Sequence, residues 1–362
     1  MVYTAISTSG LLLKLSLLVV VFVTLLAPVT QAQEEIEKIL SRLSLEEKIG
    51  QLIMASVVKA SDGSPSEETE KLIKKLKVGS LLFYDFPDPV ATARYTNKLQ
   101  RWAEDSSSGL PVLVASDFEY GPRTNIDRGV TTFPQQMALG ATGQPEFAHA
   151  AAAATAREGR SMGVHWNLAP VADVNTNPDN PVIGVRSFGS DPDQVSKFVR
   201  AAVRGYQENE MIATLKHYPG HGDTATDSHY GLPKVEYGRS KLRTHLQPFK
   251  AGIEAGAGAV MTAHIVVEVL DPDLPATMSE KIIADLLRGR QGFDGVVLTD
   301  ALNMGGIEKH FGKAEAAVGA LKAGVDVVMS VGDYRDALQV RNGILEAVRS
   351  GEISISHIDN SV

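Results

Sequence analysis

The sequence predicts a (β/α)₈ barrel, an α/β fold, that forms a single domain. Eight short apolar runs follow one another along the chain, each separated from the next by a stretch of helical pattern. Several of these runs are apolar at successive positions, which is typical of parallel strands buried on both faces. The main rival is a doubly wound open sheet, but no early glycine-rich dinucleotide fingerprint accompanies the first run.

The expected elements alternate regularly. Strands are expected over residues 51–56, 78–84, 111–117, 164–171, 213–217, 259–265, 295–302 and 325–330. Amphipathic or alanine-rich helices are expected over residues 67–76, 90–104, 145–161, 192–209, 240–255, 279–288 and 312–323. Ser44 followed by Glu46 and Glu47 forms a capping box, which predicts a helix start just before the first strand.

The domain is expected to span residues 33–362, because no linker composition or internal repeat interrupts it. Residues 353–362 begin a helical pattern and the sequence then ends. This fits either a short last helix or a natural chain that continues past Val362, with the domain truncated here at its C-terminus.

Composition excludes several classes of function. The formal net charge of −8 argues against a nucleic-acid partner, which normally meets a basic patch. The chain has no cysteine, which excludes disulfide scaffolds, thiolate zinc sites and cysteine nucleophiles.

The N-terminus predicts a secretory signal peptide over residues 1–32. An almost unbroken apolar run over residues 15–27 follows Lys14, and small residues lead up to a cleavage site after Ala32. The alternative is a single membrane anchor, although the run is short for a full span. We therefore expect a periplasmic or secreted protein without stable membrane insertion after leader cleavage.

Polar residues gather where the expected strands end, which is where barrel enzymes build their active sites. Asp117 ends the third run, Lys216 and His217 end the fifth, His264 ends the sixth and Asp300 ends the seventh. The loop after the fourth run carries Arg186. This convergence predicts an enzyme.

Two of these features favour proton and nucleophile chemistry. A charged carboxylate directly after a buried strand, as at Asp300, costs free energy unless it is solvated, paired or employed in catalysis. The alternative role for such an aspartate is to cap the following helix. Asp227 and His229 are two residues apart and share a side in an extended segment. An aspartate hydrogen-bonded to a histidine raises the basicity of the imidazole, which suits proton transfer. The same hydrogen bond can instead serve only to stabilise the conformation of a loop.

The histidines also allow a metal hypothesis, in which His217, His221, Asp223 and His229 ligate a transition metal. A metal-dependent barrel hydrolase normally shows paired histidines after the first strand, and none follow residues 51–56 here. We therefore expect no metal and no cofactor.

The motifs resemble those of family 3 glycoside hydrolases, specifically the β-N-acetylglucosaminidase branch. The resemblance covers most of the mature chain and rests on the segments Lys216–Thr224 with Asp227–His229, Phe133–Pro134 with Met137–Ala141, Asn167–Val174, Val182–Gly189, Met261–Ile265 and Leu298–Leu302.

The resemblance implies a barrel fold and retaining hydrolysis that releases terminal β-linked N-acetylglucosamine from a carbohydrate substrate. It implies that Asp300 is the nucleophile, that His229 is the general acid/base and that Asp227 is its partner. It also implies sugar binding by Asp117, Arg186, Lys216 and His217.

The loop after the third strand departs from the family pattern. The family often reads Asp-Gln-Glu-Gly-Gly-Arg, whereas this chain reads Asp117-Phe118-Glu119-Tyr120-Gly121-Pro122-Arg123, so that its arginine comes one residue later. Arg123 or Arg128 is expected to replace the usual sugar-contacting arginine, and the sequence does not decide between the two.

Other functions remain as alternatives. A β-N-acetylglucosaminide phosphorylase or a β-glucosidase of the same family is the near alternative, and a metal-dependent barrel hydrolase is the distant one. A catalytically silent sugar-binding protein is expected to lack Asp300 or His229, and both are present. The sequence indicates no oligomeric state.

Overall fold

The computed structural model describes residues 33–362. The chain divides into two compact units, Met1–Ser44 and Leu45–Val362. Within the described part of the first unit, residues 33–42 are helical. The signal peptide expected over residues 1–32 lies outside the described residues.

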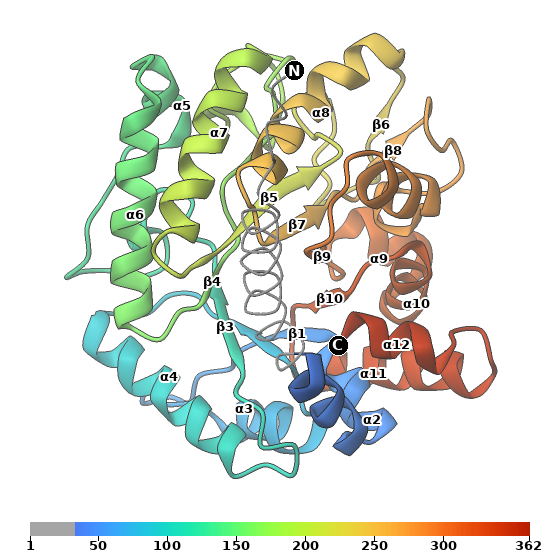
Figure 1. Ribbon diagram of the computed structural model, residues 1–362. Helices are drawn as coiled ribbons and strands as arrows, with labels where there is room; N and C mark the ends of the chain where they lie inside the picture. Colours follow the sequence, from blue (N-terminus) through green and yellow to red (C-terminus); the bar gives the residue numbers. More distant parts are fainter. Residues whose placement is uncertain (1–32) are drawn as a thin grey trace, which may run out of the picture. The chain divides into compact units, whose positions relative to one another are not determined.

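The second unit is a closed barrel of parallel strands, which confirms the predicted fold class (Figure 1). The strands follow one another around the barrel in the order β1-β10-β9-β7-β5-β4-β3-β2. Their bounds are β1 (Ile53–Ser56), β2 (Ser80–Leu82), β3 (Leu113–Ser116), β4 (Trp166–Asn167), β5 (Ile212–Tyr218), β7 (Ala259–Thr262), β9 (Val296–Ala301) and β10 (Val327–Ser330). A separate two-stranded sheet pairs β6 (Lys234–Val235) with β8 (Val266–Val267).

Helices surround the strands in Figure 1. They are α2 (Leu45–Gln51), α3 (Glu67–Lys71), α4 (Pro89–Glu104), α5 (Gln136–Ala141), α6 (Pro145–Ser161), α7 (Pro192–Gln207), α8 (Arg239–Glu254), α9 (Gly305–Phe311), α10 (Lys313–Ala323), α11 (Tyr334–Arg349) and α12 (Ile355–Ser361). Short 3₁₀ helices are η2 (Pro122–Thr124), η3 (Gly184–Arg186) and η4 (Ala276–Met278). The segments η1 (Leu72–Leu76) and η5 (Lys281–Arg290) are π-helical.

Aspartate caps fix the start of three long helices. Asp88 and Asp191 each precede a proline in the first turn, and their carboxylates accept hydrogen bonds from Ala91 N and Asp193 N. Asp333 forms a capping box with Asp336 at the start of α11.

The fourth strand is much shorter than the predicted run over residues 164–171. The chain continues beside β5 past Asn167, since Thr214 N donates to Ala169 O at 2.9 Å. Contact with β5 also continues past Pro170, since Val171 forms a bridge with Lys216 and Ala172 N donates to Lys216 O at 2.7 Å, although Pro170 itself has no N–H group to donate. The irregular segment that follows positions Asp173 next to the end of β5.

The core has two parts. Apolar side chains between strands and helices form the larger part, and a second cluster fills the inside of the barrel with Met54, Leu82, Ala115, Trp166, Leu168, Ala259, Met261, Leu298, Val327 and Met329. Strands β1, β7 and β10 are buried at every position, as expected for strands covered on both faces.

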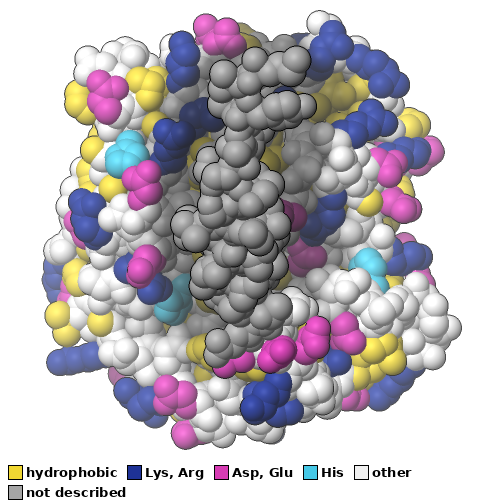
Figure 2. Space-filling model, viewed as in Figure 1, with side chains coloured by type: hydrophobic (Ala, Val, Ile, Leu, Met, Phe, Trp, Pro, Cys, Tyr) yellow, Lys and Arg dark blue, Asp and Glu magenta, His cyan; other side chains and the backbone are white. Residues whose placement is uncertain are grey.

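Among the described residues, no helix has the length and apolar character that spanning a membrane requires. Figure 2 shows basic and acidic side chains interspersed over the visible face of the molecule.

Candidate active site

A cavity of about 270 Å³ lies at the carboxyl ends of the barrel strands. Its floor consists of Leu168, Met261 and Met329, which also belong to the core inside the barrel. Strand ends and the loops that follow them provide its polar lining, which consists of Tyr84, Asp117, Arg186, Lys216, His217, His221, Ser228, His229, Asp300 and Asn303. The structure therefore brings together residues that are nearly 220 positions apart in the chain.

Two acidic and two basic side chains form an ion-pair cluster on one side of the cavity. Nζ of Lys216 lies 2.6 Å from Asp117 Oδ1 and 2.7 Å from Glu119 Oε1. Arg186 makes a bidentate pair with Glu119, with Nε to Oε2 at 2.9 Å and Nη2 to Oε1 at 2.7 Å. Such a cluster presents fixed charges and donors that can hold the hydroxyl groups of a polar ligand.

The cluster keeps its members charged. Burial by itself would raise the pKa of Glu119, but Lys216 and Arg186 outweigh it and hold that pKa well below its usual value. Burial likewise disfavours the charged forms of Lys216 and Arg186, but the nearby carboxylates outweigh it and raise the pKa of both groups.

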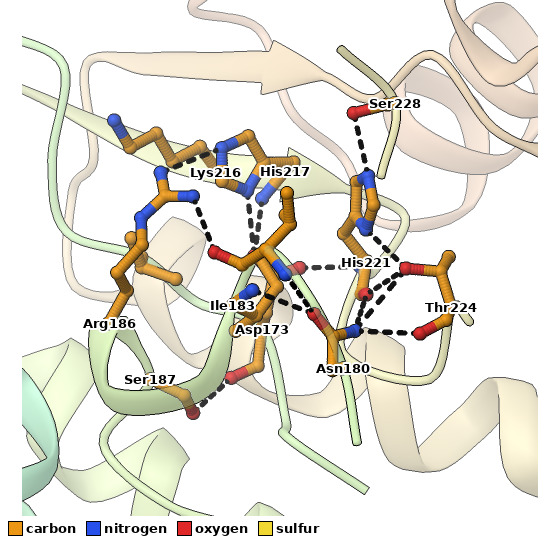
Figure 3. Close-up of polar contacts among 12 residues, drawn as sticks. Asp173, Asn180, Ile183, Arg186, Ser187, Lys216, His217, His221, Thr224 and Ser228 are labelled. Carbon is orange, nitrogen blue, oxygen red and sulfur yellow. Dashed lines mark hydrogen bonds and ion pairs between the residues drawn. The ribbon is translucent and has the colours of Figure 1, made fainter. Parts of the chain in front are cut away.

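Asp173 is a fully buried carboxylate that fastens the end of β5 (Figure 3). Its Oδ2 lies 2.7 Å from His217 Nδ1 and 3.2 Å from His217 N, and its Oδ1 accepts from His221 N at 2.6 Å. A carboxylate only accepts hydrogen bonds, so His217 Nδ1 is the donor. Asp173 therefore fixes the ring of His217 with Nε2 free to act in the cavity, where Arg186 Nη2 lies 3.4 Å away.

The loop after β5 carries the Asp227–His229 pair. Oδ1 of Asp227 lies 2.7 Å from His229 Nδ1 and accepts from His229 N at 2.8 Å. The local conformation differs from the extended segment predicted, because Tyr230 N and Gly231 N both donate to Asp227 O and close a turn. The side chain of His229 is 56% exposed, so its ring is accessible from the cavity and from solvent.

Asp300 lies in β9 on the wall of the same cavity. One carboxylate oxygen accepts a hydrogen bond from Ala301 N at 2.8 Å. Burial by itself would raise its pKa, but His217, His264 and the Ala301 N–H group favour the charged form, so that the pKa of Asp300 lies below its usual value. At neutral pH the group is a carboxylate, the form that a nucleophile requires.

The structure does not bring Arg123 or Arg128 to the cavity. Arg123 is exposed, and Nη1 lies 3.4 Å from Ile126 O. Arg128 pairs with Asp88 at 3.3 Å on the surface. The turn η2 begins directly after Gly121, whose φ of 93° favours glycine, and it directs the arginine away.

Sequence reasoning missed three residues that the geometry makes central: Tyr84, Glu119 and Asp173. Tyr84 O–H lies 3.5 Å from Asp117 Oδ2, and burial together with Asp117 and Asp300 raises its pKa well above the usual value. Glu119 was detectable, because it follows the third strand two residues after Asp117. Asp173 was detectable as the first carboxylate after the fourth apolar run. Its hydrogen bonds to His217 and His221 could not be predicted from the sequence.

The proposed metal ligands do not converge. Asp223 contacts Thr176 and Lys241, each at 2.7 Å, while the His221 ring contacts the hydroxyls of Thr224 and Ser228. Within residues 33–362, no three histidine or acidic side chains are arranged to hold a metal ion.

Comparison with known proteins agrees with this geometry. Residues 44–362 match the glycosyl hydrolase family 3 N-terminal domain. The chain belongs to glycosyl hydrolase family 3. The family 3 chain is 38% identical over 281 residues to Beta-hexosaminidase A of Pseudoalteromonas piscicida, with 72% of this chain and 47% of that protein covered. It is 31% identical over 345 residues to Beta-hexosaminidase LpqI of Mycobacterium tuberculosis, with 92% and 85% covered.

Solved structures also resemble this chain closely. A β-N-acetylglucosaminidase from Paenibacillus sp. has a TM-score of 0.85 and 42% identity, with 88% of this chain and 61% of that chain covered. A β-N-acetylhexosaminidase from Beutenbergia cavernae has a TM-score of 0.81 and 30% identity, with 88% and 96% covered. This family 3 chain thus spans about half the length of one relative and most of the length of others.

Proposed function

We propose that this family 3 chain is a retaining glycoside hydrolase that releases terminal β-linked N-acetylglucosamine. One observation carries the proposal: an ionised Asp300 and His229, whose ring is hydrogen-bonded to Asp227, line the same small cavity. A nucleophile and a proton donor that face one reacting centre are the minimum for double displacement at an anomeric carbon. Relatives named as hexosaminidases support the choice of sugar.

In the first step, the Asp300 carboxylate forms a bond to the anomeric carbon while the bond to the leaving oxygen breaks. The protonated His229 ring gives its proton to that oxygen. In the second step, neutral His229 takes a proton from water, the oxygen of that water bonds to the anomeric carbon and the Asp300 carboxylate leaves. Asp227 holds Nδ1 and stabilises the charged ring, so that the other nitrogen carries the transferred proton.

The ion-pair cluster fits the role of holding the sugar. Asp117 is 25% exposed and lines the cavity, so its carboxylate can accept from hydroxyl groups, while Lys216 and Arg186 can donate. The volume of about 270 Å³ lies below the ~300–1,000 Å³ of sites for drug-sized ligands and suits a single sugar ring.

A phosphorylase is the near alternative. A β-glucoside phosphorylase has a TM-score of 0.82 and 25% identity, with 91% of this chain and 59% of that chain covered. Phosphate would then replace water in the second step and give a sugar phosphate as product.

A product assay separates these functions. The purified chain is incubated with nitrophenyl β-N-acetylglucosaminide or β-glucoside, with and without phosphate and with and without a chelator. We expect preferred cleavage of the N-acetylglucosaminide, free sugar in the β configuration by NMR at early times, and no effect of chelator. A sugar phosphate as main product, preference for the glucoside, or loss of activity with chelator would each contradict the proposal.

We also propose that the protein is exported and cleaved after Ala32, on the basis of the apolar run over residues 15–27. N-terminal sequencing of the protein from periplasm or medium is expected to begin at Gln33. A mature chain that still begins at Met1 would contradict this proposal.

A further inference from the structure

The start of α9 lies against the loop that carries Asp227 and His229. Gly305 N donates to His229 O at 3.0 Å, and Gly306 N donates to Ser228 O at 2.9 Å. Two consecutive main-chain groups of the loop are therefore held by two consecutive N–H groups of α9. Nζ of Lys309, one turn further along the helix, donates to Tyr230 O at 3.1 Å.

The contact requires glycine at both positions. A Cβ atom at residue 305 would lie 2.8 Å from His229 O, and one at residue 306 would lie 2.6 Å from Gly231 O and 2.7 Å from Ser228 O. Neither glycine has a positive φ, and both lie within a helix, where alanine is the more favourable residue. The main obstacle to alanine at these positions is thus the backbone of the loop, and at residue 305 the Lys309 side chain also lies 3.3 Å away.

The same segment also carries the nucleophile. Gly305 and Gly306 follow Asp300 by five and six residues, and Met304 N donates to Ala301 O at 3.1 Å in the turn between them. A short hydrogen-bonded turn therefore connects Asp300, on one wall of the cavity, to the two N–H groups that hold the loop of Asp227 and His229.

We infer that Gly305 and Gly306 are positioning residues that hold the Asp227–His229 loop in its catalytic place, so that the segment of the nucleophile also sets the position of the acid/base. The inference rests on the proposed function. Without the two glycine contacts, this part of the loop keeps the 3.1 Å hydrogen bond from Lys309 Nζ to Tyr230 O and the 3.0 Å contact between Ser228 Oγ and His221 Nε2 (Figure 3).

The test is Gly306→Ala, with Gly238→Ala as the matched control. Gly238 also lies at a helix start, has an ordinary φ of −73°, and has open space where a Cβ would be placed. For Gly306→Ala we expect kcat/KM to fall by about tenfold or more on N,N′-diacetylchitobiose, whose leaving group needs a proton, but by less than about threefold on the activated nitrophenyl substrate. Gly238→Ala is expected to match the wild type on both.

Hydrogen exchange gives a readout that does not depend on activity. Amides of residues 223–231 are expected to exchange faster in Gly306→Ala than in wild type or Gly238→Ala, with an unchanged thermal midpoint. Equal losses on both substrates, no loss on either, or unchanged exchange in the loop would overturn the inference.

A second variant covers the case in which Gly306→Ala does not fold. Lys309→Met removes only the exposed hydrogen bond to Tyr230 O and is expected to show the same substrate-dependent pattern with a smaller loss. Lys309→Met with wild-type kinetics and wild-type exchange would then overturn the inference. If the wild type cleaves neither substrate, the proposed function fails, while the exchange experiment still decides whether the glycines hold the loop.

Discussion

Nδ1 of His217 lies 2.7 Å from Oδ2 of Asp173, a carboxylate with no exposed surface. Asp173→Asn replaces one acceptor oxygen by an amide donor, which then faces the N–H groups of His217 or His221. We expect a loss of about 3 kcal/mol in the free energy of unfolding and a fall in kcat/KM of roughly 10- to 100-fold, because His217 loses its fixed orientation.

Urea unfolding and steady-state kinetics check this prediction. Asp179→Asn, at an exposed position in the same loop, is the control and should leave both quantities unchanged. A stable and fully active Asp173→Asn variant would show that the buried carboxylate is not needed.

Replacing the proposed nucleophile, Asp300, should abolish turnover. Asp300→Asn keeps the size of the side chain but removes the ionised oxygen, so we expect kcat to fall at least about 10³-fold with little effect on folding. Asp294→Asn, at an exposed position before the same strand, serves as the control. The nucleophile assignment is wrong if Asp300→Asn retains substantial turnover.

The loss of activity on removing the proposed acid/base, His229, should depend on the leaving group of the substrate. For His229→Ala we expect a loss of about 10²-fold or more on a substrate with a poor leaving group and a clearly smaller loss on an activated one. Asp227→Asn should give the same pattern more weakly, because it removes the acceptor for Nδ1. Rates on a series of aryl and alkyl glycosides measure this, and a uniform loss across the series counts against the role of His229.

Glu119 should support both stability and substrate binding. Glu119→Gln leaves Lys216 with Asp117 as its ion-pair partner and removes the carboxylate that Arg186 contacts through two nitrogens, and breaking such a buried cluster costs about 3 kcal/mol. We expect a lower thermal midpoint and a higher KM, since Lys216 and Arg186, the two side chains proposed to bind the sugar, lose their common partner. A variant with a lower midpoint but an unchanged KM would limit Glu119 to a structural role.

Acid should destabilise the protein through His221. Burial, together with His217, lowers the pKa of this ring to about 4 from an ordinary value of 6.5. Between pH 6.5 and about 4 the unfolded state binds a proton that the folded state does not, so stability falls as pH decreases through this window, by an amount on the order of 3 kcal/mol from this group.

Unfolding measured at pH 7 and pH 4.5 checks the effect. His221→Asn should reduce the difference between the two pH values, although it is less stable at pH 7 because it loses contacts with Thr224 and Ser228. His310→Gln, an exposed control, should behave as the wild type. Equal pH dependence in all three proteins would contradict the role of His221.

The fold was predictable because barrel strands are local in sequence and buried on both faces. Each expected apolar run overlaps one barrel strand, although β5 (Ile212–Tyr218) extends beyond its run at both ends and β4 covers only Trp166–Asn167. Helices α5, α9 and α11 were not among the stretches named, and α9 is the one that matters, because its two glycines contact the loop of His229.

The sequence by itself determined the barrel, the strand ends at which polar residues gather, and the candidates Asp300, Asp227 and His229. These follow from local pattern, since a strand delivers its last residues to a known edge of the barrel. Only the tertiary structure decided which side chains pair across that edge. Glu119 contacts both Lys216 and Arg186, and Asp173 orients the ring of His217. Arg123 lies outside the cavity and contacts Ile126 O instead. Such partners come from loops far apart in the chain, and their contacts depend on loop conformation, which no sequence period encodes.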